Sequence, residues 1–476
     1  MVPTPQRLNS IPQSPDNPSP TRSAKSRRPT FAPMTFSDLN LDKSLSQALA
    51  DLGYTTPTTI QQKVFSVVMS GKDVCGIAQT GTGKTFAYLL PLLRQLEYSK
   101  EPYPRILIIV PTRELVVQVV SAIEQLSTHK TVRAVGIFGG VNMSPQMKQV
   151  EEGADVIVAT PGRLLDALLC GSLKPKAIKK LVIDEVDEML NLGFRPQLRR
   201  VIDLLPPRRQ NLMFSATITD DVEALIQTYF NAPVTIEAAP TGTPLEGIEQ
   251  AAYYVPNFNT KVALLKWLLA RHSAEMTKVL VFVSSRRLAD QLFEPMAEFL
   301  PEAVGVIHSN KEQNYRFRSV SDFSSGAIRV LIATDIIARG IDVSGVSHVI
   351  NFDLPEVAEH YIHRIGRTGR AGEKGQAISF ITDKDKAALE GIEALMNYHV
   401  PVKELPEEVD ISTELTADEL PKANTKEIQI KRPKIDEGGG AFHEKSLKRQ
   451  KVNVKVSFKE KMMDKYGKPK KRKPKK

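Results

Sequence analysis

The sequence predicts an α/β protein built from two parallel-sheet domains. Short apolar runs rich in β-branched residues alternate with stretches of helical periodicity. Strands that are apolar throughout are typical of parallel sheets covered by helices on both faces. The alternation pauses once, near residue 240, and then resumes with a second set of apolar runs. A chain of 476 residues is also longer than one ordinary domain requires.

Each expected domain contains five recognisable strands. From Leu41, apolar residues follow helical spacing as far as Gly53, which ends this first helix. The expected strands of the first domain are 74–78, 106–110, 155–160, 181–184 and 211–214. Those of the second domain are 279–283, 304–307, 330–334, 348–352 and 377–381. Beyond about residue 400 no further strand is expected.

The composition changes along the chain and indicates where the domains begin and end. Prolines and glycines at 240, 242, 244 and 247 are typical of a linker. The expected parts are a disordered Pro/Ser-rich segment 1–33, an N-terminal segment 34–62, a first domain 63–236, a linker 237–247, a second domain 248–400, a flexible extension 401–440 and a basic disordered tail 441–476.

Positive charge is concentrated at the two ends. The net charge is +10, but residues 441–476 hold 15 Lys/Arg against 3 Asp/Glu. The core is therefore mildly acidic, so a nucleic-acid surface on it requires individually placed residues, while the tail can act as a polyelectrolyte. No apolar run is long enough to span a membrane, and no secretory signal is present, so a cytoplasmic location is expected. KPKKRKPKK at 468–476 also resembles a nuclear localisation signal, which would apply in a eukaryote.

A candidate phosphate-binding loop has the sequence AQTGTGKT and consists of Ala78, Gln79, Thr80, Gly81, Thr82, Gly83, Lys84 and Thr85. It lies between an apolar strand and a helical stretch, as such a loop requires. Its glycines let backbone N–H groups turn toward phosphate oxygens, and the helix N-terminus adds partial positive charge. Lys84 is expected to reach the β- and γ-phosphates of ATP, and Thr85 to bind Mg²⁺. Because Ala78 stands where the generic pattern has glycine, an ordinary turn remains the alternative.

Four acidic residues follow the strand in LVIDEVDEML (181–190). In a parallel sheet they reach the same carboxyl edge as the phosphate loop, so Mg²⁺ bound to ATP, with Lys84 beside it, is the expected cationic partner. Asp184 is expected to hold Mg²⁺, and Glu185 to orient and deprotonate an attacking water. The alternative is a solvated helix start, which accounts for Glu188 but poorly for Asp184.

Together these motifs resemble those of the DEAD-box RNA helicases, with DEVD in place of DEAD. The resemblance extends from about Phe36 to Phe380 and is greatest to the bacterial RhlE-like group. It implies tandem RecA-like domains and an ATP-dependent RNA helicase. Such an enzyme hydrolyses ATP at the interdomain cleft when stimulated by RNA, and it locally unwinds short duplexes or remodels RNA–protein complexes.

The resemblance also assigns nucleotide-site residues in both domains. It makes 34–62 an adenine-sensing segment, in which Gln61 pairs with the adenine edge and Phe36 stacks on the base. Further residues have roles in interdomain coupling, and these are Asp187, Ser215, Thr217, His363 and Arg364. Arg364 is expected to connect the motif HRIGRTGR (363–370) to the acidic loop that follows the strand 181–184. The catalytic set is Glu185, Lys84, Arg367 and Arg370, in which the two arginines meet the γ-phosphate. Asp342 is assigned to the ATP ribose.

The RNA-binding residues implied by the resemblance lie at or just after strand ends. They are Pro111, Thr112, Arg113, Gly139, Gly140, Thr160, Pro161, Gly162, Arg163, Gln313, Arg316, Thr334 and Arg339. Glycines, hydroxyls and single arginines suit sugar–phosphate contact, so little sequence preference is expected. Contacts to the 2′-hydroxyl would favour RNA over DNA. Single strands and short duplexes are the expected partners, with ribosomal or RNA-decay assemblies as candidate protein partners.

Two departures and two rival functions stay open. Val186 replaces the usual alanine of the acidic signature, and Ser309 stands where the family usually has glycine. One rival is an ATP-independent RNA chaperone that acts through the basic tail. The other is a two-domain translocase stimulated by DNA. His360 and His363 have a spacing compatible with zinc, but two histidines alone are a weak signal.

Overall fold

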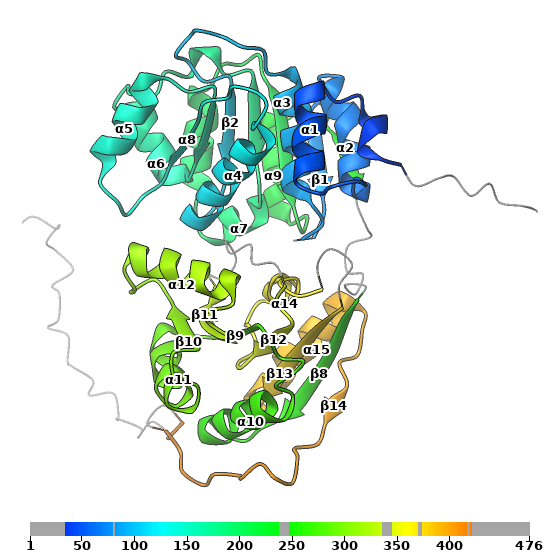
Figure 1. The fold of residues 1–476 in the computed structure, drawn as a ribbon, viewed down its shortest axis with the longest axis vertical. Coiled ribbons are helices and arrows are strands. Elements are labelled where there is room, and N and C mark those ends of the chain that lie inside the picture. The colour runs from blue at the N-terminus through cyan, green and yellow to red at the C-terminus, as the bar shows by residue number, and fades with distance from the viewer. Residues whose placement is uncertain are drawn as a thin grey trace, which may run out of the picture. The chain divides into compact units, whose positions relative to one another are not determined.

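The computed structural model describes residues 34–79, 81–237, 247–335, 345–369, 374–416 and 419–420. Up to Glu419 these residues belong to one compact unit that contains two seven-stranded sheets. Every strand pair in both sheets is parallel. The expected α/β fold with two parallel-sheet domains is therefore confirmed (Figure 1).

The first domain has the strand order β3-β4-β2-β5-β6-β1-β7. Its strands are β1 (Val74–Ile77), β2 (Ile106–Ile109), β3 (Ala134–Ile137), β4 (Val156–Ala159), β5 (Lys180–Ile183), β6 (Gln210–Ser215) and β7 (Val234–Glu237). Its helices are η1 (Phe36–Leu39), α1 (Lys43–Asp51), α2 (Thr59–Met69), α3 (Lys84–Gln95), α4 (Arg113–Leu126), α5 (Met143–Glu152), α6 (Pro161–Leu169), η2 (Pro175–Ala177), α7 (Val186–Asn191), α8 (Arg195–Leu204) and α9 (Asp220–Tyr229).

The second domain repeats this plan with the order β10-β11-β9-β12-β13-β8-β14. Its strands are β8 (Ile248–Tyr254), β9 (Val279–Val283), β10 (Val304–Ile307), β11 (Val330–Thr334), β12 (His348–Asn351), β13 (Gly375–Ile381) and β14 (Val402–Lys403). Its helices are α10 (Phe258–Arg271), α11 (Arg286–Phe299), α12 (Gln313–Ser325), α14 (Ala358–Ile365), η3 (Asp383–Asp385) and α15 (Lys386–Met396).

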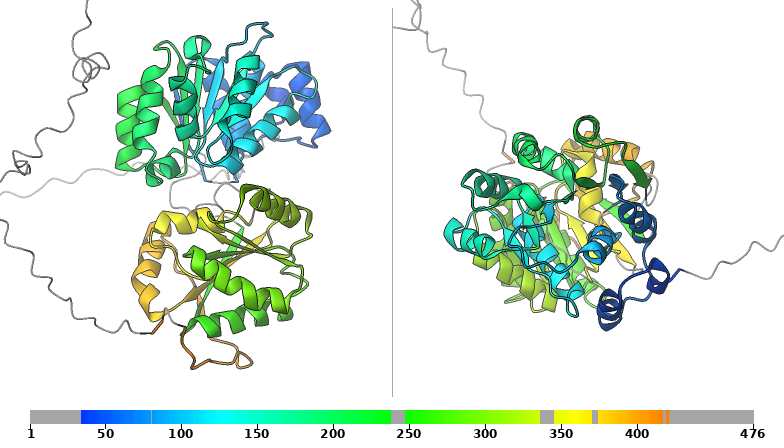
Figure 2. Two further views of the ribbon diagram at one scale, coloured as in Figure 1. Left: turned by 90° about the vertical axis from the view of Figure 1, so that its left-hand side faces the viewer. Right: turned by 90° about the horizontal axis from the view of Figure 1, so that it is seen from above.

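Apolar side chains on both faces explain why these strands are buried in the middle of each domain. In β2, Ile106 and Ile108 contribute to one hydrophobic cluster, while Leu107 and Ile109 contribute to another. Successive side chains of a strand point to opposite faces, so a continuous apolar run fills two cores. Helices α1 to α4 supply the first cluster and α5 to α9 the second, and Figure 2 shows helices on both faces of each sheet.

The structure contains four strands that the sequence did not predict: β3, β7, β8 and β14. Three of them lie at sheet edges and β8 lies next to an edge, where side chains are less buried and the apolar signal is weaker. The expectation that strands stop near residue 400 is wrong, because β14 pairs with β8. The linker was expected to begin at residue 237, but Glu237 belongs to β7. Residues 238–246 lie outside the described residues, as do 1–33 and 421–476.

Residues 401–416 and 419, here called the C-terminal strap, pack on the second domain instead of forming a flexible extension. Val409 is 6% exposed and belongs to the same hydrophobic cluster as α10. Ser412 donates its N–H to the Thr260 hydroxyl at 3.0 Å and accepts from the Asn257 side chain at 2.6 Å. Glu419 accepts the N–H of Phe258, the first residue of α10, at 2.6 Å. The strap therefore caps this helix and extends the second domain past residue 400.

Ending the chain after Val400 is expected to destabilise the second domain by about 2–4 kcal/mol, because a buried valine and a helix cap are lost together. Urea unfolding, followed by fluorescence of Trp267 in α10, measures the change. Ending the chain after Leu420 is the matched control and should leave the free energy of unfolding unchanged. Equal stability of the two shortened proteins would contradict a structural role for the strap.

Two further features bear on the expectations from sequence. In the part of the chain that the structure describes, no helix is both long and apolar enough to cross a bilayer. Cys75 is buried in β1, where burial raises its thiol pKa to about 11. Cys170 is exposed at the C-terminal end of α6.

Candidate nucleotide-binding and catalytic site

The phosphate loop connects β1 to α3 and has the backbone that its glycines permit. Gly81 has φ 82° and Gly83 has φ 87°, in the left-handed region that other residues rarely adopt. At the start of the loop, Ala78 donates its N–H to the carbonyl of Ser215 at 3.0 Å, which ties the loop to the end of β6. Gly83 immediately precedes α3, so the positive end of the helix dipole faces this loop. Thr80 lies outside the described residues.

Lys84 is the cation that meets the acidic cluster. It is 7% exposed, and its ammonium group makes no hydrogen bond to any residue that the structure describes. Its positive charge nevertheless lowers the pKa of Asp184, Glu185 and Asp187. A buried ammonium beside carboxylates, with its donors unused, is suited to bind the phosphates of a nucleotide.

Asp184 and Glu185 follow β5 at the carboxyl edge of the first sheet and are 5% and 7% exposed. Glu185 has φ 52°, a conformation that is uncommon for a residue other than glycine, and its N–H donates to Asp184 Oδ1 at 2.9 Å. Burial raises the pKa of Asp184, although Lys84 opposes this effect. Burial also raises the pKa of Glu185 to about 7, against the opposing charges of Lys84 and Arg367. Such a pKa suits a group that exchanges protons near neutral pH.

Asp187 connects the acidic loop to the end of β6. Its Oδ2 accepts three hydrogen bonds of 3.1 Å, from the N–H groups of Ala216 and Thr217 and from the Thr217 hydroxyl. Ser215 donates its hydroxyl to the Thr217 carbonyl at 2.7 Å and so shapes this turn. His363 Nε2 lies 4.0 Å from Asp187 Oδ2. Burial opposes ionisation of Asp187. The charges of His363 and Lys84, together with the Glu188 N–H and the Ser215 hydroxyl, outweigh burial, and the pKa of Asp187 lies below the usual aspartate range.

The sequence HRIGRTGR (363–370) contains three arginines, which have different positions. Arg367 is 5% exposed, and its charge acts on the pKa of Glu185. Arg364 is 1% exposed and donates to both carboxylate oxygens of Asp335, at 2.5 and 2.8 Å. It also donates to the Asp353 carbonyl, and all these partners are in its own domain. This corrects the expectation that Arg364 contacts the acidic loop: a bidentate carboxylate at the end of β11 holds it instead. Arg370 lies outside the described residues.

Gln61 contacts the phosphate loop directly. Its amide oxygen accepts the N–H of Thr58 at 2.9 Å, and its amide nitrogen donates to the Gly83 carbonyl at 3.2 Å. A Cβ on residue 83 would lie 2.5 Å from that nitrogen, so only glycine permits this approach. Phe36 is 6% exposed within the core, which leaves little of its ring for a base. Tyr54 is 51% exposed and packs edge-on against Phe86 of α3, so it offers a larger aromatic surface near the loop.

Several residues expected to bind RNA contact one another. Arg113 donates to the amide oxygen of Gln313 at 2.9 Å, and Gln313 donates to Glu114 at 3.1 Å. Arg316 pairs with the same Glu114 carboxylate and also donates to Gln313 at 3.1 Å. Glu114 is 4% exposed and Arg316 is 7% exposed, so this is a buried network. It joins the start of α4 in the first domain to the start of α12 in the second.

The remaining predicted RNA-binding residues mostly mark helix starts at the carboxyl edges of the sheets. Pro111 and Thr112 lead into α4, and the Thr112 hydroxyl accepts the N–H of Leu115 at 3.3 Å. Thr160 precedes α6, whose first residues are Pro161 and Gly162, and Thr334 ends β11. These helix N-termini point backbone donors outward, as phosphate contact requires.

The last members of the set show tight local packing. Arg163 donates to the Gln146 side chain at 3.0 Å and to the Val141 carbonyl at 3.1 Å. Val141 directly follows Gly139 and Gly140 in the chain. Gly140 has φ 76°, and the Arg113 guanidinium occupies the space that a side chain there would need. Arg339 and Asp342 lie outside the described residues.

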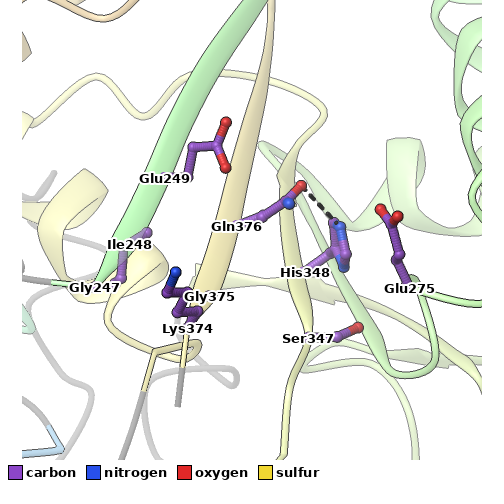
Figure 3. Close-up of a pocket in the computed structure, with 9 residues that line it drawn as sticks. All are labelled: Gly247, Ile248, Glu249, Glu275, Ser347, His348, Lys374, Gly375 and Gln376. Carbon is purple, nitrogen blue, oxygen red and sulfur yellow. Dashed lines mark hydrogen bonds between the residues drawn. The ribbon is translucent and has the colours of Figure 1, made fainter. Parts of the chain in front are cut away.

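A cavity of about 500 Å³ lies elsewhere, at the amino ends of β8, β12 and β13 (Figure 3). It is lined by Gly247, Ile248, Glu249, Glu275, Ser347, His348, Lys374, Gly375 and Gln376. Within it, His348 Nε2 and Gln376 Oε1 are 3.1 Å apart. Nucleotides bind at the carboxyl edge of such sheets, so this cavity is separate from the nucleotide site.

Sequence reasoning assigned no individual role to Glu114, Asp335 or Tyr54. Glu114 lies in PTREL (111–115), beside the predicted RNA-binding residues, but only the folded chain brings it to Arg316. Asp335 is the acid of ATD (333–335) and directly follows the expected strand 330–334, where a carboxylate after a strand was a usable signal. Tyr54 was visible as an aromatic residue beside Gly53, before the helix that carries Gln61.

The fold and site define a two-domain protein of the phosphate-loop nucleotide-hydrolysing class. Residues 58–225 match the DEAD/DEAH box helicase family, and residues 260–372 match the helicase conserved C-terminal domain. RNA helicase CrhR of Synechocystis sp. is 37% identical over 372 residues, which cover 78% of this chain and 75% of the relative. ATP-dependent RNA helicase RhlB of Pseudomonas putida is 39% identical over 383 residues, which cover 79% and 95%.

A solved structure gives the same result. S. cerevisiae Dbp5 bound to RNA and ADP BeF3 is 30% identical, with a TM-score of 0.70 that covers 78% of this chain and 95% of that chain. The chain therefore belongs to the DEAD-box family of ATP-dependent RNA helicases, and its two sheets are tandem RecA-like domains.

Proposed function

We propose that the protein uses RNA-stimulated ATP hydrolysis to separate short RNA duplexes or to remodel RNA–protein complexes locally. The observation that carries this proposal is the burial of Lys84 beside Asp184, Glu185 and Asp187, next to the phosphate loop. An ammonium with unused donors beside carboxylates suits a triphosphate with its metal ion. The relatives support the nucleic acid: CrhR and RhlB are RNA helicases, and the Dbp5 structure holds RNA and a nucleotide complex.

In this proposal Glu185 orients the attacking water and takes its proton, since its carboxyl has a pKa of about 7. Lys84 and Arg367 offset the negative charge that develops on the transferred phosphoryl group. The influence of Arg367 on the Glu185 pKa supports a role for this arginine at the same site. Arg370 is proposed as a second arginine finger by resemblance alone.

Thr85 and Asp184 are the residues that would hold Mg²⁺. Their hydroxyl and carboxylate oxygens fit this ion, which binds through one or two protein oxygens and completes its shell with phosphates and water. Among the described residues, no cluster of three or more His, Cys, Asp or Glu side chains could hold a metal by itself. When bound, Mg²⁺ neutralises the β- and γ-phosphates.

The remaining nucleotide contacts are proposed by resemblance. Gln61 pairs with adenine, and its bond to Gly83 supports coupling of that pairing to the phosphate loop. Phe36 is proposed to cover the base, although its burial limits the ring face available. Asp342 is proposed to contact the ribose.

RNA is proposed to bind at the strand ends and helix starts that carry the predicted RNA set. Because residues for ATP and for RNA come from both domains, each ligand would favour the same joined arrangement, and the two binding events reinforce each other. A groove that bends one strand cannot hold a regular duplex, so local strand separation follows. The basic residues of 441–476 would add nonspecific, salt-dependent affinity.

The domain boundaries, the subgroup within the family, the activity of the DEVD signature, the partners and the location are also proposed. The proposed domain boundaries are those expected above, except that Glu237 joins the first domain and the C-terminal strap joins the second. The compact core with a short basic tail supports the RhlE-like group. The DEVD signature should stay active, because Val186 is fully buried in the apolar core and leaves the neighbouring carboxylates in place. Ribosomal or RNA-decay assemblies are proposed partners, and the cytoplasm is the proposed location, or the nucleus in a eukaryote.

Steady-state ATPase rates without nucleic acid, with single-stranded RNA and with DNA of the same sequence test the proposal. RNA is expected to raise the rate at least tenfold and DNA much less, since 2′-hydroxyl contacts are proposed. Stimulation by DNA equal to that by RNA would instead favour the translocase. An RNA chaperone without ATPase would show no rate in any arm, and Lys84→Ala would leave its cellular function intact.

A further inference from the structure

We propose that the Tyr88 hydroxyl is a positioning group for the metal-binding side of the nucleotide site, acting on Asp184 and Thr85. The inference deepens the proposed function and rests on it. The sequence assigns Tyr88 no role, because the predicted phosphate loop ends at Thr85. It is a positioning residue, because it would act through two side chains rather than touch the nucleotide.

Tyr88 lies one helical turn into α3, four residues after Lys84 and three after Thr85. Residues at these spacings share one face of a helix, so the phenol extends from the face that carries the phosphate-binding groups. Tyr88 is 0% exposed, and its ring packs against Phe214 of β6 with 5.3 Å between ring centroids. The ring is therefore held by packing, and its hydroxyl has a fixed place.

The hydroxyl is buried and lacks a well-formed hydrogen bond to any residue that the structure describes. Leaving such a group unsatisfied costs about 1–3 kcal/mol, whereas phenylalanine would fill the same space without this cost. The groups that act on the hydroxyl are Asp184, Thr85 and Glu185. A phenol carries its proton at neutral pH, so it can donate to Asp184, the acceptor that lies beside it.

A phenol donor beside Asp184 would fix the rotation of that carboxylate. Asp184 Oδ1 already accepts the Glu185 N–H at 2.9 Å, so a second donor would leave few orientations open. The Thr85 hydroxyl is also a neighbour, and it can donate to the phenol oxygen. Groups that orient metal ligands in this way typically change metal affinity 10- to 100-fold when removed.

Tyr88→Phe tests the proposal, since it removes one oxygen and keeps the ring against Phe214. The binding of a fluorescent ADP analogue is measured by titration in excess Mg²⁺ and again in EDTA. The variant is expected to lose about tenfold in affinity with Mg²⁺ and to bind like the wild type in EDTA. The Mg²⁺ concentration for half-maximal ATPase should rise by a similar factor.

Tyr253→Phe is the matched control: Tyr253 is a buried tyrosine on β8 of the second domain, and this change should leave both titrations unaltered. Equal Mg²⁺ dependence in Tyr88→Phe and wild type would overturn the inference. So would an equal loss with and without Mg²⁺, or a loss matched by a lower melting temperature, because each indicates a merely structural role. If the wild type itself bound ADP without any Mg²⁺ dependence, the proposed function would fail instead.

Discussion

Glu185→Gln is expected to lower the RNA-stimulated ATPase rate by about two to four orders of magnitude while ATP still binds. The amide keeps the size of the side chain and its place before α7, but it cannot accept a proton from water. Glu185 suits the role of base because it is 7% exposed and has a pKa of about 7. Single-turnover hydrolysis and ATP titration separate the two effects. A residual rate within tenfold of the wild type would rule out Glu185 as the base.

The same variant has a stability signature whose sign follows from the raised pKa. Glu185 has a pKa of about 7 when folded, against 4.5 for an ordinary glutamate carboxyl, so folding is penalised progressively as pH rises from about 4.5 to 7. Glutamine removes this penalty. Without nucleotide, Glu185→Gln should therefore be more stable than the wild type at pH 8, by on the order of 1–3 kcal/mol, and equally stable near pH 4.5. An equal difference at both pH values would contradict the raised pKa.

Lys84→Ala is expected to lower ATP hydrolysis by about 10³-fold and to weaken ATP binding, because it removes the buried cation for the phosphates. It also leaves three neighbouring carboxylates without this charge, so a loss of about 3–5 kcal/mol of stability is expected. Equilibrium unfolding and nucleotide titration measure the two losses. Lys72→Ala, which removes an exposed lysine, is the control and should change neither quantity. Wild-type nucleotide affinity in Lys84→Ala would refute the phosphate-binding role.

The sequence predicted the parts of the site that lie within short stretches of chain. The phosphate loop and the acidic loop each follow a buried strand, and parallel strands bring both to one edge, so Lys84 and Glu185 could be paired in advance. Arg364 was assigned to the wrong partner, because its contact with Asp335 joins residues 29 positions apart and depends on how the second domain folds. Glu114 was missed for a similar reason, since its contact with Arg316 joins residues 202 positions apart.

The fold shows the same division between local and distant information. Central strands such as β2 and β9 are apolar throughout and were predicted, whereas β3 is a half-buried edge strand and β14 an exposed one. The C-terminal strap was predicted to be flexible because its sequence is acidic. Its order comes from single contacts, such as that between Glu419 and Phe258, which no periodicity reveals.

The network of Arg113, Glu114, Gln313 and Arg316 has a consequence for how firmly RNA is held. These polar groups already satisfy one another, so an incoming strand would exchange protein–protein bonds for protein–phosphate bonds rather than add new ones. Such an exchange yields a small net gain in free energy. RNA bound in this way would dissociate easily, which suits an enzyme that must release each strand after ATP hydrolysis.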